Sequence, residues 1–203
     1  MRTKTAVAFF AFLAALTARH ALAQNSTEDW PCVQRKVPTI SAGAIWSGPD
    51  LASASPWSED SEAAQLAQKL ASRRVDLDEA DRLIEEFTKS AGKEKEIRLV
   101  RVFAGVLELI NAERDRILQG IQRYARGQRL LADRIREQSD KIGAVRDEPA
   151  VQPSTDITDI ERQFAWDKRI FEERRRSLTY VCETPVILER RAFEIARRIQ
   201  ERL

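Results

Sequence analysis

Two cysteines, Cys32 and Cys182, are the most reactive side chains in this sequence of 203 residues. They do not form a C-x-x-C pair, which is the usual spacing of a redox-active dithiol. In an exported chain, two cysteines most often pair with each other. The sequence therefore predicts a structural Cys32–Cys182 disulfide that closes a loop of about 150 residues. A thiol nucleophile and an intermolecular bridge are the alternatives.

Export is indicated by the first 23 residues. Arg2 and Lys4 precede a weakly apolar run over residues 6–18, and small residues at Ala21 and Ala23 match the requirement of a signal peptidase. The run is shorter than the roughly 20 residues that span a bilayer. We expect a cleaved signal peptide over residues 1–23, rather than a membrane anchor, and a mature protein that is periplasmic or secreted.

Cleavage would also remove the only histidine, His20. Without imidazole, the usual Ser-His-Asp and Cys-His mechanisms are excluded, as are zinc and non-haem iron sites that use histidine. The sequence also contains no C-x-x-C-H haem motif, Gly-rich phosphate loop or calcium loop. We therefore predict no metal, no cofactor and no enzymatic activity. A carboxylate-dependent, peptidoglycan-cleaving enzyme is the one class that survives, with Glu85, Glu108 or Glu161 as candidates.

The net charge gives no argument for a nucleic-acid partner. Loss of residues 1–23 leaves 31 basic residues against 32 acidic ones, so the formal charge changes from +2 to −1. We expect no nucleic acid as partner and no stable membrane insertion after signal cleavage. Of the basic clusters at 73–74, 174–176, 190–191 and 197–198, the last three stand beside glutamates, which favours ion pairing on helix surfaces over binding of an anionic ligand.

Residues 24–57 differ in composition from the rest of the chain. They contain four prolines and three of the four tryptophans, among them Trp46 and Trp57, and they show no helical period. We expect an extended, irregular arm that docks on helices through Val33, Val37, Ile40 and Trp46, because aromatic residues are rare in disordered linkers.

Helical patterns fill residues 58–203, which we predict to be one helical bundle domain. Helices are expected over 58–72, with Ser58 as the cap, and over 78–90, beginning at Asp76 or Asp78 and ending at Gly92. The strongest pattern lies over 93–145, where a spacing of alternately four and three residues continues for thirteen positions. These positions are Phe103, Leu107, Ile110, Arg114, Ile117, Ile121, Tyr124, Gln128, Leu131, Ile135, Gln138, Ile142 and Val145.

A polar turn over residues 146–156 leads into the last helices. The sequence predicts one helix over 156–182 and another over 185–203, because Thr184-Pro185 has the pattern of a cap followed by proline at the first helical position. Short connections make antiparallel neighbours. The fold class is therefore all-α: a long coiled-coil-like helix packs with antiparallel helices, and the last two form a three-helix bundle with its C-terminal half. Arg114 is expected where no other helix covers this seam.

These features favour a non-enzymatic protein of the cell envelope that acts as a scaffold, adaptor or assembly factor. The abundance of Ala and Arg is typical of a GC-rich bacterial genome. Tryptophan is enriched at interface hot spots, so Trp46, Trp57 and Trp166 are the candidate partner-binding residues. The partner would be another envelope protein, or a second copy of the chain. The alternative is a periplasmic chaperone or holdase, although the mature chain would lack the methionine that adaptable binding grooves often use.

Overall fold

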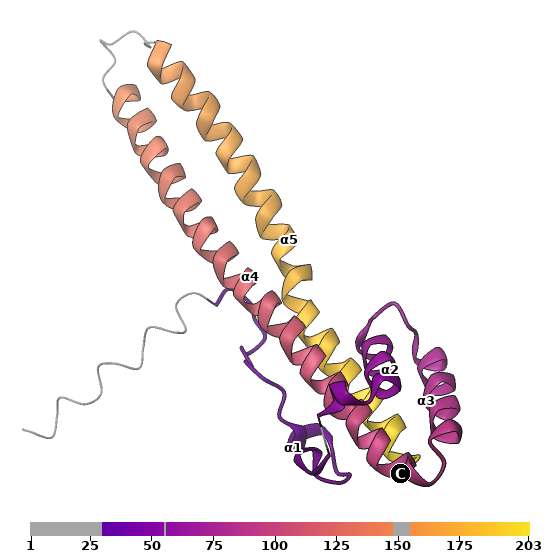
Figure 1. The fold of residues 1–203 in the computed structure, drawn as a ribbon. Helices are drawn as coiled ribbons and strands as arrows, with labels where there is room; N and C mark the ends of the chain where they lie inside the picture. Colours follow the sequence, from indigo (N-terminus) through magenta and orange to yellow (C-terminus); the bar gives the residue numbers. More distant parts are fainter. Residues whose placement is uncertain (1–29, 55, 148–154) are drawn as a thin grey trace, which may run out of the picture.

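The computed structural model describes residues 30–54, 56–147 and 155–203, so the predicted signal peptide lies outside the described part. Within these residues helices are the only regular secondary structure, which confirms the all-α prediction (Figure 1). In chain order they are α1 (Ala42–Ile45), the 3-10 turns η1 (Leu51–Ser53) and η2 (Trp57–Glu59), α2 (Ser61–Ala71), α3 (Leu77–Ala91), the 3-10 turn η3 (Gly92–Glu94), α4 (Lys95–Arg146) and α5 (Thr155–Gln200).

The first helices begin at aspartate caps. The Asp60 side chain accepts a hydrogen bond from the Ala63 N–H, and Asp76 caps α3 in the same way. The prediction of Ser58 as the first cap is wrong, because Ser58 lies in η2 and the cap of α2 is Asp60, two residues later. At the end of α3, Gly92 adopts a φ of 55°, a left-handed conformation that favours glycine.

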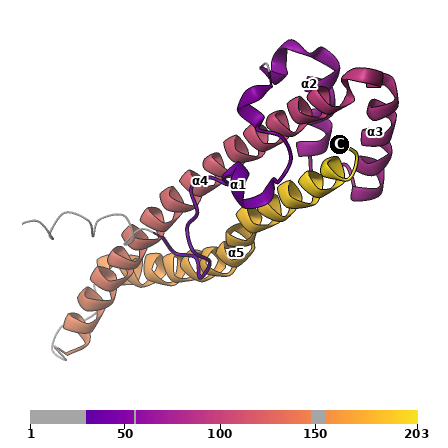
Figure 2. The same cartoon turned by 90° about the horizontal axis from the view of Figure 1, so that it is seen from below.

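A compact base forms where α2 and α3 cover the N-terminal part of α4 and the C-terminal part of α5 (Figures 1 and 2). The interior of this base is apolar, and its largest fully buried side chains include Phe103, Leu70, Ile84, Leu99 and Ile195. Burial of each such side chain contributes about 1.5–3 kcal/mol. The base therefore contains most of the hydrophobic stabilisation of the chain.

Beyond the base, α4 and α5 continue side by side as a long antiparallel hairpin (Figure 1). At 52 residues, α4 is about 78 Å long. The register is fixed by side chains that cross between the helices: the Tyr124 hydroxyl donates to the Arg174 carbonyl at 2.8 Å, and Arg146 contacts Glu161 at 2.9 Å. All thirteen positions of the predicted seam on α4 are buried or half-buried, which confirms that pattern.

The predicted break at Thr184-Pro185 is wrong, and with it the three-helix bundle. Helix α5 runs without interruption from Thr155 to Gln200 and contains Pro185. A proline inside a helix removes one hydrogen bond and costs about 3 kcal/mol, and Figure 2 shows α5 bending along its length. The helix continues because both its halves pack on the unbroken stripe of α4. Pro185 is itself buried, and its carbonyl accepts a hydrogen bond from Arg114.

The described part of the arm, residues 30–54, docks on the helices as expected, although with fewer anchors. Ile40 is buried, and both its N–H and its carbonyl are bonded to the Asn111 side chain, at 2.9 and 3.0 Å. Trp46 is buried as well. Val37 is partly exposed, and Val33 is fully exposed, so the prediction that Val33 anchors the arm is wrong.

Candidate contact surface on the helical hairpin

A clasp of one disulfide and one arginine holds the arm at the level where the hairpin leaves the base. Cys32 and Cys182 form the predicted disulfide, with Cα atoms 5.6 Å apart, within the usual range. Cys182 lies inside α5 and not in a turn between two helices, because α5 is continuous. The disulfide therefore joins the arm directly to the rigid hairpin.

Arg114 completes the clasp from the α4 side. Its side chain is only 2% exposed, which corrects the expectation of an uncovered position on the seam. It donates to the Val37 carbonyl at 3.1 Å and to the Pro185 carbonyl at 3.3 Å, and it lies 3.7 Å from Glu189. Burial lowers the pKa of this guanidinium, and the nearby Glu189 carboxylate opposes the shift. The arrangement ties arm, α4 and α5 together, and its role is structural.

The seam of the hairpin beyond the clasp contains a buried carboxylate. Asp167 is 1% exposed and accepts two hydrogen bonds from Arg134, at 2.8 and 2.6 Å, and one from Gln138 at 3.0 Å. Burial raises the pKa of Asp167, but the hydrogen bonds from Arg134 and Gln138 outweigh this effect and keep it below its ordinary value. Asp167 is therefore a buried carboxylate whose oxygens are engaged by hydrogen bonds from the facing helix.

Asp167 is absent from the residues singled out by sequence reasoning. The signal was its spacing: it follows Phe164 by three residues and precedes Phe171 by four, which places it on the apolar stripe of α5. Gln128, at a seam position of α4, donates to the Phe171 carbonyl at 3.2 Å. Polar contacts thus replace much of the apolar packing in this part of the seam.

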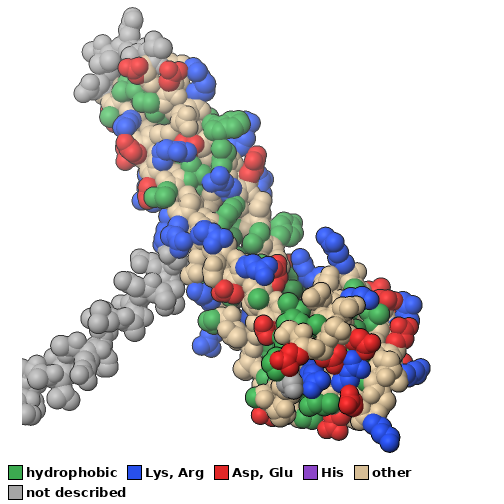
Figure 3. Space-filling model, viewed as in Figure 1, with side chains coloured by type: hydrophobic (Ala, Val, Ile, Leu, Met, Phe, Trp, Pro, Cys, Tyr) green, Lys and Arg blue, Asp and Glu red, His purple; other side chains and the backbone are tan. Residues whose placement is uncertain are grey.

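Large apolar side chains lie on the outside of the same stretch of hairpin. Leu130 of α4 is 73% exposed, and Trp166 of α5 is 58% exposed. Leu130 and the half-buried Ile170 line a shallow groove between the helices, together with Gly127, Arg134 and others. We call Leu130, Trp166 and Ile170 the hairpin face. In Figure 3, apolar side chains appear along the rod between basic ones.

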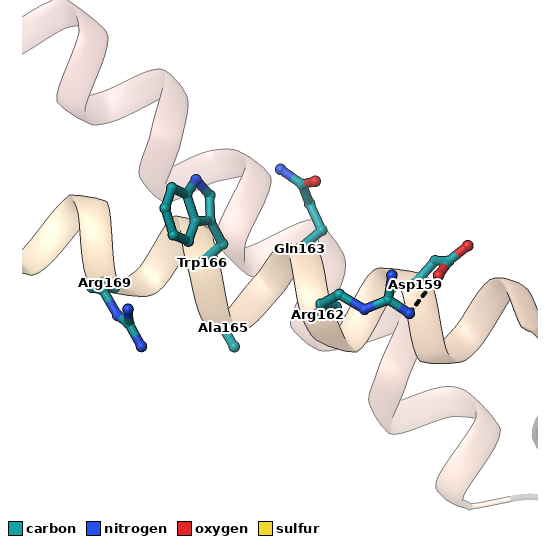
Figure 4. Close-up of a pocket in the computed structure, with 6 residues that line it drawn as sticks. All are labelled: Asp159, Arg162, Gln163, Ala165, Trp166 and Arg169. Atoms are coloured by element: carbon teal, nitrogen blue, oxygen red, sulfur yellow. Dashed lines mark ion pairs between the residues drawn. The ribbon is translucent and has the colours of Figure 1, made fainter.

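The surroundings of Trp166 are shown in Figure 4. Its indole stands out from α5 on a stretch that also exposes Arg162 and Arg169, and Arg162 pairs with Asp159 at 3.0 Å. Beside Trp166 lies an open hollow of about 570 Å³ that is lined by residues of α5 alone. The lining residues are Asp159, Arg162, Gln163, Ala165, Trp166 and Arg169. A hollow of this shape suits a flat contact with a second surface better than enclosure of a small molecule.

The other two candidate tryptophans serve the base. Trp46 stacks on Phe103 with ring centroids 4.3 Å apart, and its indole N–H donates to the Pro49 carbonyl. Trp57 is half-buried, and its indole N–H donates to the Glu108 carboxylate at 2.8 Å. Trp46 is therefore a core residue, and of the three candidates Trp166 presents the most exposed ring.

The three candidate catalytic glutamates lie apart from one another. Glu85 is exposed, and the neighbouring Lys89, followed by Arg202, lowers its pKa, whereas a general acid needs a raised pKa. Glu108 is engaged by Trp57, and Glu161 pairs with Arg146 near the tip of the hairpin. The structure does not bring these carboxylates together into one site.

The basic clusters form several of the ion pairs that the sequence predicts. Arg175 contacts Glu172 at 2.8 Å, and Arg198 contacts Glu194 at 2.6 Å. Arg191 instead donates to the Leu70 carbonyl and so ties α5 to the end of α2. Much of this positive charge is used within the fold.

Comparison with protein families, with curated proteins and with solved structures returned no match. Over the described ranges, none of the helices combines the length and the apolar character that a membrane crossing requires.

Proposed function

We propose that this chain is an exported, non-enzymatic envelope protein that works by contact, as a scaffold, adaptor or assembly factor, and that the hairpin face is its contact surface. One observation carries the proposal. Leu130 and Trp166 are 73% and 58% exposed on a hairpin whose own seam is already closed by buried apolar residues and by the polar contacts of Asp167. Large apolar residues at such a position do nothing for the hairpin itself, and tryptophan is the residue most enriched at interface hot spots.

The shape of the molecule supports the same function. The base contains the apolar core, and the clasp fixes the arm where the hairpin begins. The hairpin face is thus held away from the base on two paired helices, where a partner can approach it without steric hindrance from α2 and α3 (Figure 1).

Export to the periplasm or beyond belongs to this proposal. A disulfide is compatible with an oxidising compartment, and the sequence predicts cleavage after Ala23. The mass of the protein recovered from that compartment tests this point. We expect an N-terminus at Gln24, and a protein that keeps residues 1–23 would contradict the prediction.

Photo-crosslinking tests the contact surface. A photoreactive amino acid is placed at position 166 or 130 of the full chain, and as a matched control at position 89, an exposed lysine on α3 in the base. We expect covalent adducts from positions 166 and 130 and none from position 89. If the hairpin positions give no adduct in cells, or if position 89 gives the same adducts, the hairpin face is not the contact surface.

A further inference from the structure

We infer that the hairpin face binds a second copy of this chain, with the two α4 helices antiparallel and related by a two-fold axis at Leu130. This inference rests on the proposed function, since it names the partner of the same surface.

Five exposed residues follow one another along this side of α4. They are Arg123, Arg126, Leu130, Asp133 and Glu137, at spacings of three and four residues that keep them on one helix face. The two residues on the N-terminal side of Leu130 are basic, and the two on the C-terminal side are acidic. The face is therefore polar along its length, with an apolar residue at the point where the charge changes sign.

A two-fold axis perpendicular to α4 at Leu130 converts this pattern into complementary pairs. Arg123 lies seven residues before Leu130 and Glu137 seven residues after it, so each Arg123 meets Glu137 of the second copy. Arg126 lies four residues before Leu130 and Asp133 lies three residues after it. Because each residue advances about 100° around the helix, both lie on the same lateral side of α4, so each Arg126 meets Asp133 of the second copy. Since a two-fold interface repeats every contact, four opposite-charge pairs surround Leu130 and its symmetry mate.

The parallel arrangement does the opposite. It places Arg123 against Arg123 and Glu137 against Glu137, and like charges across an interface repel. The charge order on α4 therefore selects the antiparallel pairing.

The side chains that α5 contributes fit the same axis. Trp166 of α5 lies level with residue 134 of α4, because the adjacent Asp167 binds Arg134. Arg174 lies level with Tyr124, because the Arg174 carbonyl accepts a hydrogen bond from the Tyr124 hydroxyl. The axis therefore brings Trp166 of one copy to the height of Arg174 of the other, where an indole and a guanidinium can form a cation–π contact. Ile170, which lines the groove with Leu130, lies near the axis.

The two carboxylates on this face make only exposed contacts within one chain. Glu137 pairs with Lys141 at 2.7 Å, and Asp133 pairs with Arg136 at 2.9 Å, all four side chains being more than half exposed. Such exposed pairs contribute a few tenths of a kcal/mol. Both carboxylates can therefore accept a second basic partner.

A charge exchange between two variants tests the inference by sedimentation of the full mature chain. The wild-type protein is expected at twice its monomer mass at high protein concentration. Arg123→Glu and Glu137→Arg are each expected to weaken association roughly tenfold or more, because each substitution turns two attractive pairs into repulsive ones. An equimolar mixture of the two variants restores every pair, and so does the double variant, so both are expected to regain the dimer mass.

The controls separate charge from folding. Lys168→Glu reverses an exposed charge two residues from Trp166, on another side of α5, and is expected to leave the dimer unchanged. Circular dichroism confirms that each variant keeps its helices. A monomeric wild-type protein overturns the inference, as do single variants that stay dimeric or a mixture that stays monomeric. If the protein is monomeric but positions 166 and 130 still crosslink to another protein, the inference fails and the proposed function stands.

Discussion

Replacing Asp60 by Asn tests the ion pair that joins α2 to α4 in the base. The Asp60 carboxylate accepts hydrogen bonds from Nε and Nη2 of Arg98, at 2.7 and 2.8 Å. It also caps α2 by accepting a hydrogen bond from the Ala63 N–H at 3.1 Å. Because Asn caps a helix about as well as Asp, Asp60→Asn removes the charge of the pair and keeps the cap.

The magnitude follows from the titration of this carboxyl. The hydrogen bonds from Arg98 lower the pKa of Asp60 from its ordinary value of 3.8 to about 2, against the opposing effect of burial. A shift of nearly two pKa units corresponds to about 2.5 kcal/mol of folding free energy. The Asp60 side chain is only 10% exposed, so screening by solvent reduces this figure little. We expect Asp60→Asn to lower the free energy of unfolding by about 2 kcal/mol at neutral pH.

The pH dependence gives the sharper test. Because the pKa of Asp60 is lower in the folded than in the unfolded protein, its contribution is complete above pH 3.8 and is lost as the pH falls toward about 2. Urea unfolding of both proteins, followed by circular dichroism from pH 7 down to pH 2, measures the difference between them. We expect this difference to shrink steadily below pH 4 and nearly to vanish at pH 2.

Glu62→Gln is the matched control, because Glu62 also contacts Arg98, at 2.8 Å, but is 65% exposed. Exposed pairs contribute about 0–1 kcal/mol, so this substitution should change the unfolding free energy by less than Asp60→Asn at neutral pH. The reasoning is refuted if wild type and Asp60→Asn are equally stable at pH 7, or if their difference at pH 2 is as large as at pH 7.

Three further changes test the clasp and the packing of α4. Reduction of the disulfide should lower the free energy of unfolding by up to about 5 kcal/mol, because the bond closes a loop with a sequence separation of 150. The double change Cys32→Ser with Cys182→Ser should have the same effect. An unchanged Tm under reductant would contradict this prediction. Gly105→Ala should lower the free energy of unfolding by about 1–2 kcal/mol, because the added Cβ would lie 2.8 Å from the Cβ of Ala67. This steric effect outweighs the helix propensity of alanine, which favours the substitution by about 1 kcal/mol. Gly120→Ala, which meets one atom at 3.9 Å, should instead stabilise, and chemical denaturation that gives both changes the same sign would refute the comparison.

The fold was predictable where one segment specifies its own structure. The alternating spacing on α4 requires a long helix with a buried stripe, and Asp76 and Gly92 mark the ends of α3 through local chemistry alone. The pairing of Cys32 with Cys182 followed from there being two cysteines in the chain. These predictions did not depend on knowing how the segments pack.

The features that sequence reasoning missed depend on contacts between segments. Pro185 follows a threonine, as it would at the start of a helix, and only the packing of α5 on the continuous stripe of α4 decides that the helix passes through it. Asp167 has the charge of a surface residue, and its burial depends on Arg134, which reaches it from the other helix. The hairpin face was recognised in part, through Trp166, because the exposure of Leu130 depends on where α5 crosses α4.

The clasp and the proline together determine how the hairpin face is presented. Pro185 removes a hydrogen bond from α5 three residues after Cys182, so α5 is weakest against bending at the level where the disulfide attaches. Arg114 donates hydrogen bonds to the Pro185 carbonyl in α5 and to the Val37 carbonyl in the arm, and so holds both segments at this point. The direction in which the hairpin leaves the base is thus determined by the same contacts that hold the arm. Loss of the disulfide should therefore weaken folding, which circular dichroism under reducing conditions measures. Sedimentation under the same conditions measures any effect on the dimer proposed across Leu130.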